Sequence, residues 1–163
     1  MAVFPILRYP DSRLRQKAKK VRSVDGSIQR LIDDMVETMR QAGGVGLAAP
    51  QIGVPLRVIV IELPGDETIA LVNPQIVKRS GEREVTEGCL SIPGYRGEIK
   101  RSTKVTVRGL DRHGREIRIK GEGLLAEALE HEIDHLNGVL YIDHLGSLDE
   151  LYKVEVETET PEI

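Results

Sequence analysis

His131-Glu132-Ile133-Asp134-His135 places two histidines four residues apart, with a glutamate directly after the first. Residues four apart on a helix lie on the same face, so both imidazoles can bind one metal ion. Glu132 can then reach a water molecule on that ion, which is the chemistry of an H-E-x-x-H motif. The stretch therefore predicts a catalytic metal site on a helix.

The pattern around this motif is helical from Gly121 to Asn137-Gly138, where a helix stop is expected. Apolar residues recur at helical spacing through it: Leu124, Leu125, Ala128, Leu129 and Leu136. Because Leu124 and Ala128 share a stripe with both histidines, we expect the metal ligands to face the core.

An amphipathic helix is predicted nearer the N-terminus. Its apolar positions are Ile28, Leu31, Ile32, Met35, Val36 and Met39. Asp25 and Ser27 can cap its start, and Gly43-Gly44 ends it.

Between the two helices the sequence has β-rich runs. Residues 57–63 and 69–72 predict one hairpin, and residues 104–110 and 115–120 predict a second, with His113 in its turn. We therefore expect an α+β fold, with antiparallel or mixed sheets packed around a central metal-binding helix. Residues 1–148 are expected to form a single domain.

Composition excludes several classes of protein. The chain has 163 residues, 40% of them hydrophobic and 30% charged, which is typical of a globular domain. Its net charge of −3 is unlike that of a generic nucleic-acid binder. No apolar run is long enough for a membrane span, and no signal peptide is visible, so we expect a cytoplasmic location.

An open catalytic metal site needs a third protein ligand. The candidates are Cys89, His144 or one of many carboxylates. Cys89, the only cysteine, stands in the polar stretch Glu87-Gly88-Cys89-Leu90-Ser91, without the apolar neighbours of a core cysteine. Cys89 is therefore favoured, and His144 is the alternative.

Residues 43–51 follow the end of the first helix and match neither a dinucleotide fingerprint nor a P-loop. Leu47-Ala48-Ala49-Pro50 suits a buried extended strand whose backbone is open to a partner. Gln51 offers a side-chain amide at the end of it.

Three motifs in this order resemble the signatures of the peptide deformylase family: Gly44-Val45-Gly46-Leu47-Ala48-Ala49-Pro50-Gln51, Glu87-Gly88-Cys89-Leu90-Ser91 and His131-Glu132-Ile133-Asp134-His135. The opening Ile6-Leu7-Arg8-Tyr9-Pro10-Asp11 is also similar to that family. The resemblance covers residues 3–146. It implies a metallohydrolase that removes the N-terminal formyl group from formyl-methionyl nascent chains and releases formate.

The resemblance also implies a role for individual residues. Cys89, His131 and His135 would hold one divalent ion, Fe²⁺ in the cell and Zn²⁺ or Ni²⁺ in purified protein. A metal-bound water would attack the formyl carbon, with Glu132 as general base. The catalytic partners would be the Gln51 amide and the Leu90 N–H, which stabilise the oxyanion. The substrate would be bound by Gly46 and by a methionine pocket formed by Val45, Leu124, Ala128 and His131.

Some residues depart from the family pattern. Glu130 stands where glutamine is usual, and Glu127 stands where an apolar residue commonly borders the methionine pocket. Residues 149–163 carry six acidic residues and one lysine, and form either an edge strand or a frayed tail. Since no motif lies in this tail, we expect it to affect stability more than chemistry, and it does not look suited to ribosomal RNA.

The expected partners are formyl-methionyl peptides of nascent chains, with transient ribosome association, no membrane and a monomeric state. Two other functions fit the metal motif alone. A zinc peptidase that cuts internal peptide bonds would share H-E-x-x-H but would not need Cys89 or Gln51. A structural metal site would be closed by a fourth ligand such as His144 and would give Glu132 no role.

Overall fold

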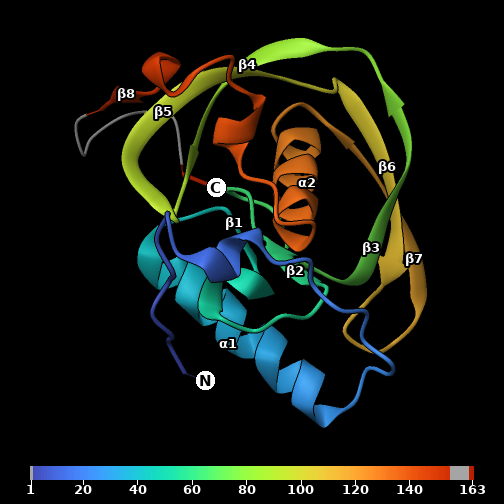
Figure 1. The fold of residues 1–163 in the computed structure, drawn as a ribbon. Coiled ribbons are helices and arrows are strands. Elements are labelled where there is room, and N and C mark those ends of the chain that lie inside the picture. Colours follow the sequence, from blue (N-terminus) through green and yellow to red (C-terminus); the bar gives the residue numbers. More distant parts are fainter. Residues whose placement is uncertain (1, 155–161) are drawn as a thin grey trace.

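Helix α2, Gly123–Leu136, runs through the middle of the molecule with β-sheets around it (Figure 1). The computed structural model describes residues 2–154 and 162–163. The other α-helix is α1, Gly26–Ala42. The strands are β1 (Gly46–Ala48), β2 (Val58–Ile61), β3 (Ile69–Ser80), β4 (Arg83–Cys89), β5 (Ile92–Arg101), β6 (Lys104–Leu110), β7 (Glu116–Glu122) and β8 (Tyr152–Lys153). Short 3₁₀ helices span Ser12–Arg15, Ala49–Ile52, Tyr141–His144 and Leu148–Glu150.

A five-stranded antiparallel sheet, in the order β1-β2-β3-β6-β7, separates the two helices. The position of β2 between the two helices explains why its sequence is continuously apolar. Val58 and Val60 pack in a cluster with α1, whereas Ile59 and Ile61 pack with α2. A strand covered on both faces has no polar side. Among the described strands, β1 lies at the edge of this sheet.

The second sheet has the order β4-β5-β8 and packs with the segment that follows α2. The long hairpin of β4 and β5 brings Cys89, the last residue of β4, beside α2. This hairpin was not predicted, because glycine, proline and charged residues interrupt any apolar alternation in it. Strand β8 adds two residues of the acidic tail to the outer edge of β5.

The predicted α+β class is confirmed, and so are both predicted helices and both hairpins. Helix α1 begins as expected, with the Asp25 carboxylate accepting hydrogen bonds from the backbone N–H groups of Ser27 and Ile28. One prediction was wrong in part, since the extended segment ends at Ala48 rather than at Pro50. Residues 49–52 form a 3₁₀ helix, with Pro50 near its start. Proline has no backbone N–H, which a strand would need for pairing but which the first turn of a helix does not use.

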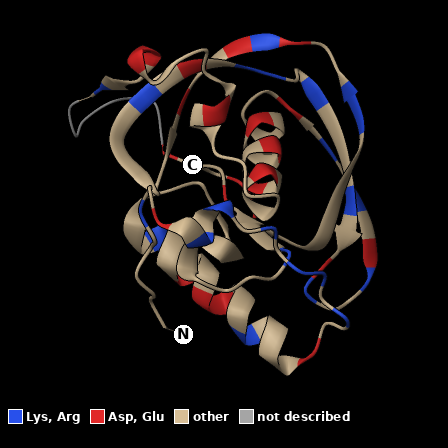
Figure 2. Ribbon diagram, viewed as in Figure 1, with Lys and Arg blue, Asp and Glu red and all other residues tan. Residues whose placement is uncertain are grey.

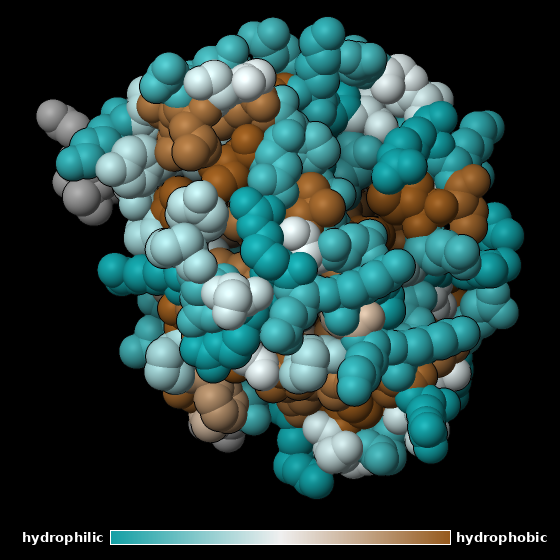
Figure 3. Space-filling view, in the orientation of Figure 1, coloured by the Kyte–Doolittle hydropathy of each residue, from teal (hydrophilic) through white to brown (hydrophobic). Residues whose placement is uncertain are grey.

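Hydrophobic residues reach the surface in several patches with hydrophilic side chains between them on the face seen in Figure 3. A mixed surface of this kind is usual for a globular protein. Within residues 2–154 and 162–163, the helices are too short or too polar to cross a membrane.

Candidate metal centre

Two turns of α2 and the end of β4 bring three candidate ligands together. The Nε2 atoms of His131 and His135 lie 3.1 Å apart, and the Cys89 Sγ lies 3.4 Å from the His135 Nε2. The three ligand atoms all lie within 4.8 Å of one another, and all three side chains are buried. Burial and the neighbouring His131 lower the pKa of His135 well below its ordinary value, which keeps the imidazole in the neutral form that binds metal.

The Glu132 carboxylate lies beside this cluster without a hydrogen-bond partner on either oxygen. Burial raises the pKa of Glu132 to about 7. Its carboxylate occupies the space where a side chain at position 46 would begin, since a Cβ on Gly46 would lie 2.3 Å from its Oε2. These groups suit a divalent metal ion with a bound water molecule. The thiolate and the two imidazoles would bind the ion, and the water would give the buried Glu132 carboxylate the hydrogen-bond partner that it lacks.

Gln51 approaches the cluster from the segment after β1. Its Oε1 accepts a hydrogen bond from the backbone N–H of Ala48 (2.9 Å), which fixes the amide orientation. Its Nε2 then points to the Ser91 hydroxyl at 3.0 Å and to the Cys89 sulfur at 3.7 Å. A fully buried amide is thus held with its donor side toward the candidate metal site.

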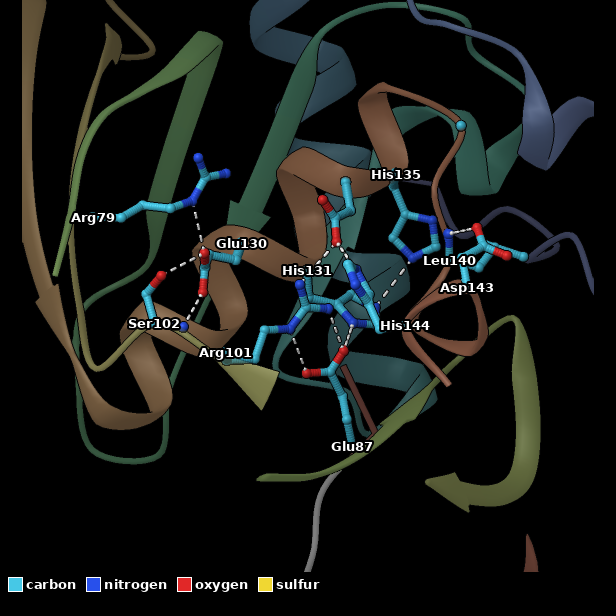
Figure 4. A network of polar contacts seen from close by, with 12 residues as sticks. Arg79, Glu87, Arg101, Ser102, Glu130, His131, His135, Leu140, Asp143 and His144 are labelled. Carbon is cyan, nitrogen blue, oxygen red and sulfur yellow. Dashed lines mark hydrogen bonds and ion pairs between the residues drawn. The ribbon is translucent and has the colours of Figure 1, made fainter. Parts of the chain in front are cut away.

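A network of charges behind the cluster holds one of its members, His131, in position (Figure 4). Glu87 accepts from the His131 Nδ1 at 2.5 Å and forms a two-bond pair with Arg101 at 2.6 and 3.0 Å. Arg101 continues to Asp134, which also contacts the His144 Nε2 at 2.9 Å. Burial alone would raise the pKa of Glu87, but His131 and Arg101 hold it below its ordinary value. The bond to Glu87 leaves the His131 Nε2 free to bind a metal.

His144, the alternative third ligand, belongs to this network and not to the ligand cluster. Its side chain is partly exposed, with Asp134 between it and the buried site. Among the described residues, the cluster of converging metal ligands contains Cys89, His131 and His135. His113 lies exposed in the turn between β6 and β7, as predicted.

Glu87 had no predicted role, although it belongs to the stretch Glu87-Gly88-Cys89-Leu90-Ser91. A charged residue two positions before a candidate ligand in a strand points to the same face as that ligand. That spacing is the signal that could have identified Glu87.

Acidic residues on α2 are unusual for a helix inside a protein (Figure 2). Glu130, at 6% exposure, accepts hydrogen bonds from Ser102 and pairs with Arg79. Glu127 is equally buried, and burial together with the Glu87 charge raises its pKa to about 8. Both side chains are buried, and an arginine of a surrounding strand pairs with each, Arg79 with Glu130 at 3.0 Å and Arg83 with Glu127 at 3.8 Å. The raised pKa of Glu127 shows that its arginine does not offset the effects of burial and Glu87.

The predicted pocket residues lie on one side of the site. Val45 and Ala128 are buried in the same apolar cluster, with Leu124 packed against it. The cluster also contains Ile163, which is 1% exposed. The predicted edge strand is present at Tyr152–Lys153, whereas residues 155–161 of the acidic tail lie outside the described part.

Comparison with known proteins identifies the family of the chain. Residues 3–151 match the family model described as polypeptide deformylase. The chain belongs to the polypeptide deformylase family. It is 58% identical to a peptide deformylase of Dehalococcoides mccartyi strain CBDB1, over 99% of this chain and 98% of that protein.

Solved structures of this family have the same fold. The crystal structure of a peptide deformylase from Legionella pneumophila is 56% identical with a TM-score of 0.89, and covers 91% of this chain and 89% of that one. A peptide deformylase from Ehrlichia chaffeensis in complex with actinonin is 41% identical with a TM-score of 0.90, and covers 92% of both chains. The family is one of metal-dependent hydrolases, and the cluster of Cys89, His131 and His135 is a group that could hold a metal ion in this chain.

Proposed function

We propose that this chain removes the N-terminal formyl group from formyl-methionyl peptides of nascent proteins and releases formate. The observation that carries the proposal is the convergence of Cys89, His131 and His135 beside the unpaired Glu132 carboxylate. Family membership supports the formyl peptide as the substrate class.

Cys89, His131 and His135 would hold a divalent ion, which we propose is Fe²⁺ in the cell. A bound ion of this kind lowers the pKa of a water molecule and polarises a carbonyl group. Two imidazoles and one thiolate would leave one coordination position of the ion open for water or substrate, as in other catalytic metal sites. Glu87 supports this set by fixing the tautomer and orientation of His131.

Glu132 is the proton carrier in the proposed reaction. Its pKa of about 7 suits a group that must accept and release a proton near neutrality. It would accept a proton from water as the water oxygen bonds to the formyl carbon. It would then give that proton to the amine nitrogen as the carbon–nitrogen bond breaks, leaving formate and a methionyl amine.

Addition of water to the formyl carbon puts a negative charge on the formyl oxygen. Hydrogen-bond donors that already point to this oxyanion would stabilise it. Gln51 is fixed by Ala48 with its amide N–H groups toward the site, and the Leu90 backbone N–H lies one residue after Cys89. We propose that both donate to the oxyanion. Loss of one such donor typically raises the barrier by about 3 kcal/mol.

Substrate binding would use the free edge of β1. A peptide that adds there as a strand would pair with the backbone at Gly46, which makes binding tolerant of sequence. The methionine side chain would enter the apolar cluster around Val45, Leu124, Ala128 and His131. Residues 1–148 would form the catalytic domain of a cytoplasmic monomer that meets its substrates at the ribosome.

Formate release tests the proposal directly. The metal-loaded protein should release formate from formyl-Met-Ala-Ser, and should leave acetyl-Met-Ala-Ser and internal peptide bonds intact. His131→Ala should lose both metal and activity, whereas His113→Ala, the same change at an exposed turn, should retain both. Cleavage of internal bonds without formate release would instead identify a peptidase.

A further inference from the structure

Residues Glu162 and Ile163 lie between the two sheets, next to the candidate metal site. In Figure 1 the C-terminal end of the chain is placed inside the molecule near β1, whereas the N-terminal end lies outside beside α1. Both residues come from the acidic tail, whose earlier residues Tyr152–Lys153 form strand β8. Their position therefore needs specific contacts to account for it.

The backbone of these two residues bridges the segments on either side of the cleft. The Val45 N–H donates to the Glu162 carbonyl at 3.3 Å, just before β1 begins. On the other side, the Ile163 N–H donates to the Gly88 carbonyl, and the Leu90 N–H donates to the Ile163 carbonyl, each at 3.2 Å. Contacts of this kind are those of a peptide added as a strand.

The side chains are held as well. Ile163 is 1% exposed and lies in the apolar cluster that contains Val45 and Ala128. The Glu162 carboxylate accepts from the Gly94 N–H at 3.1 Å and pairs with Arg96 at 3.3 Å. The dipeptide thus has an apolar anchor, an ion pair and three backbone hydrogen bonds.

A surface groove borders this position. It has a volume of about 320 Å³, and its walls include Phe4, Ile6, Leu90 and Glu162. Glu162 therefore lies in the wall of a groove that has room for a longer peptide ligand.

We propose that Glu162-Ile163 is a built-in ligand of the peptide cleft, which an incoming peptide must displace. The proposal rests on the proposed function in one respect, since it identifies the displaced site as the methionine pocket and the Leu90 oxyanion donor. The Leu90 N–H cannot serve the oxyanion while it donates to Ile163. Binding of substrate and binding of the tail are therefore mutually exclusive.

The fraction of protein whose cleft is occupied by Glu162-Ile163 sets how much KM is raised. An apparent dissociation constant rises in inverse proportion to the fraction of protein that is free to bind. A cleft filled nine-tenths of the time would raise KM about tenfold and leave kcat unchanged. Deletion of residues 162–163 should therefore lower KM and leave kcat unchanged, and the ratio of the two KM values measures the occupancy.

Hydrogen exchange tests the occupancy without any substrate. In Zn²⁺-loaded protein, the amides of Val45 and Leu90 should exchange at least tenfold faster after deletion of residues 162–163, and also in Ile163→Asp. Leu148→Asp is the matched control, because it adds the same charge directly before the tail, at a residue that is 59% exposed. It should leave both amides protected. A nonapeptide of residues 155–163 should restore protection to the deletion variant and compete with formyl-Met-Ala-Ser.

Equal exchange at Val45 and Leu90 in the full chain and in the deletion variant would overturn the proposal. An unchanged KM in a deletion variant that is folded, as judged by its Tm, would also overturn it. If the exchange rates differ but neither form releases formate, the self-binding stands and the proposed function fails.

Discussion

Gly46→Ala tests the placement of Glu132 without touching a metal ligand. The new Cβ would lie 2.3 Å from the Glu132 Oε2 and 3.0 Å from its Cδ. Ordinary contacts between heavy atoms of this kind are about 3.5 Å, so the carboxylate must move by about 1 Å. A displacement of this size at a reacting group can lower the rate about 10²-fold.

The assay is kcat for formate release at saturating formyl-Met-Ala-Ser, with metal content measured in the same sample. We expect kcat to fall about 10²-fold while the metal remains, because Cys89, His131 and His135 are not displaced. Gly26→Ala is the control, since its Cβ would meet only the Arg30 side chain at an ordinary 3.4 Å. A metal-loaded Gly46→Ala protein with kcat within fivefold of the original would refute the placement of Glu132.

Three further changes have separate readouts. Glu132→Gln should keep the metal and lower kcat at least 10²-fold, and a metal-loaded variant within tenfold of the original would remove Glu132 as the base. Cys89→Ser should bind much less metal by elemental analysis, because a serine hydroxyl is mostly protonated at neutral pH; full metal content would exclude Cys89 as a ligand. Glu127 has a folded pKa of about 8, above its ordinary 4.5, so the folded state binds more protons and stability falls as pH rises between these values. Glu127→Gln should therefore match the original Tm near pH 5 and exceed it near pH 9, and equal Tm values at both would contradict the raised pKa.

Periodicity was enough to predict the parts of the fold whose burial is visible in local sequence. The apolar stripe of α1 and the alternation of β6 and β7 each fix which face is buried. The H-E-x-x-H motif located two of the candidate ligands on α2, but its apolar stripe did not show that residues 126–133 are buried on every side of the helix.

The β4–β5 hairpin could not be predicted in this way, because its burial depends on pairs between distant residues. Glu87 and Arg101 are both buried charges, and each is tolerated only because the other neutralises it across the hairpin. Glu130 likewise depends on Ser102 and Arg79. Local sequence gives the charges but does not give their partners.

The position of Ile163 had no local signal either. A single apolar residue after an acidic stretch is expected at the surface. Its burial depends on a cleft built by β1 and the end of β4, which are more than seventy residues earlier in the chain.

Formate release under anaerobic conditions is the most direct test of the central claim that Glu132 acts beside a metal held by Cys89, His131 and His135. Protein loaded with Fe²⁺ should release one formate per formyl-Met-Ala-Ser consumed, and should lose this activity in air while Ni²⁺- or Zn²⁺-loaded protein keeps its own. Removal of the metal by a chelator should abolish formate release, and metal addition should restore it. Equal formate release by the metal-free and the metal-loaded protein would contradict the account.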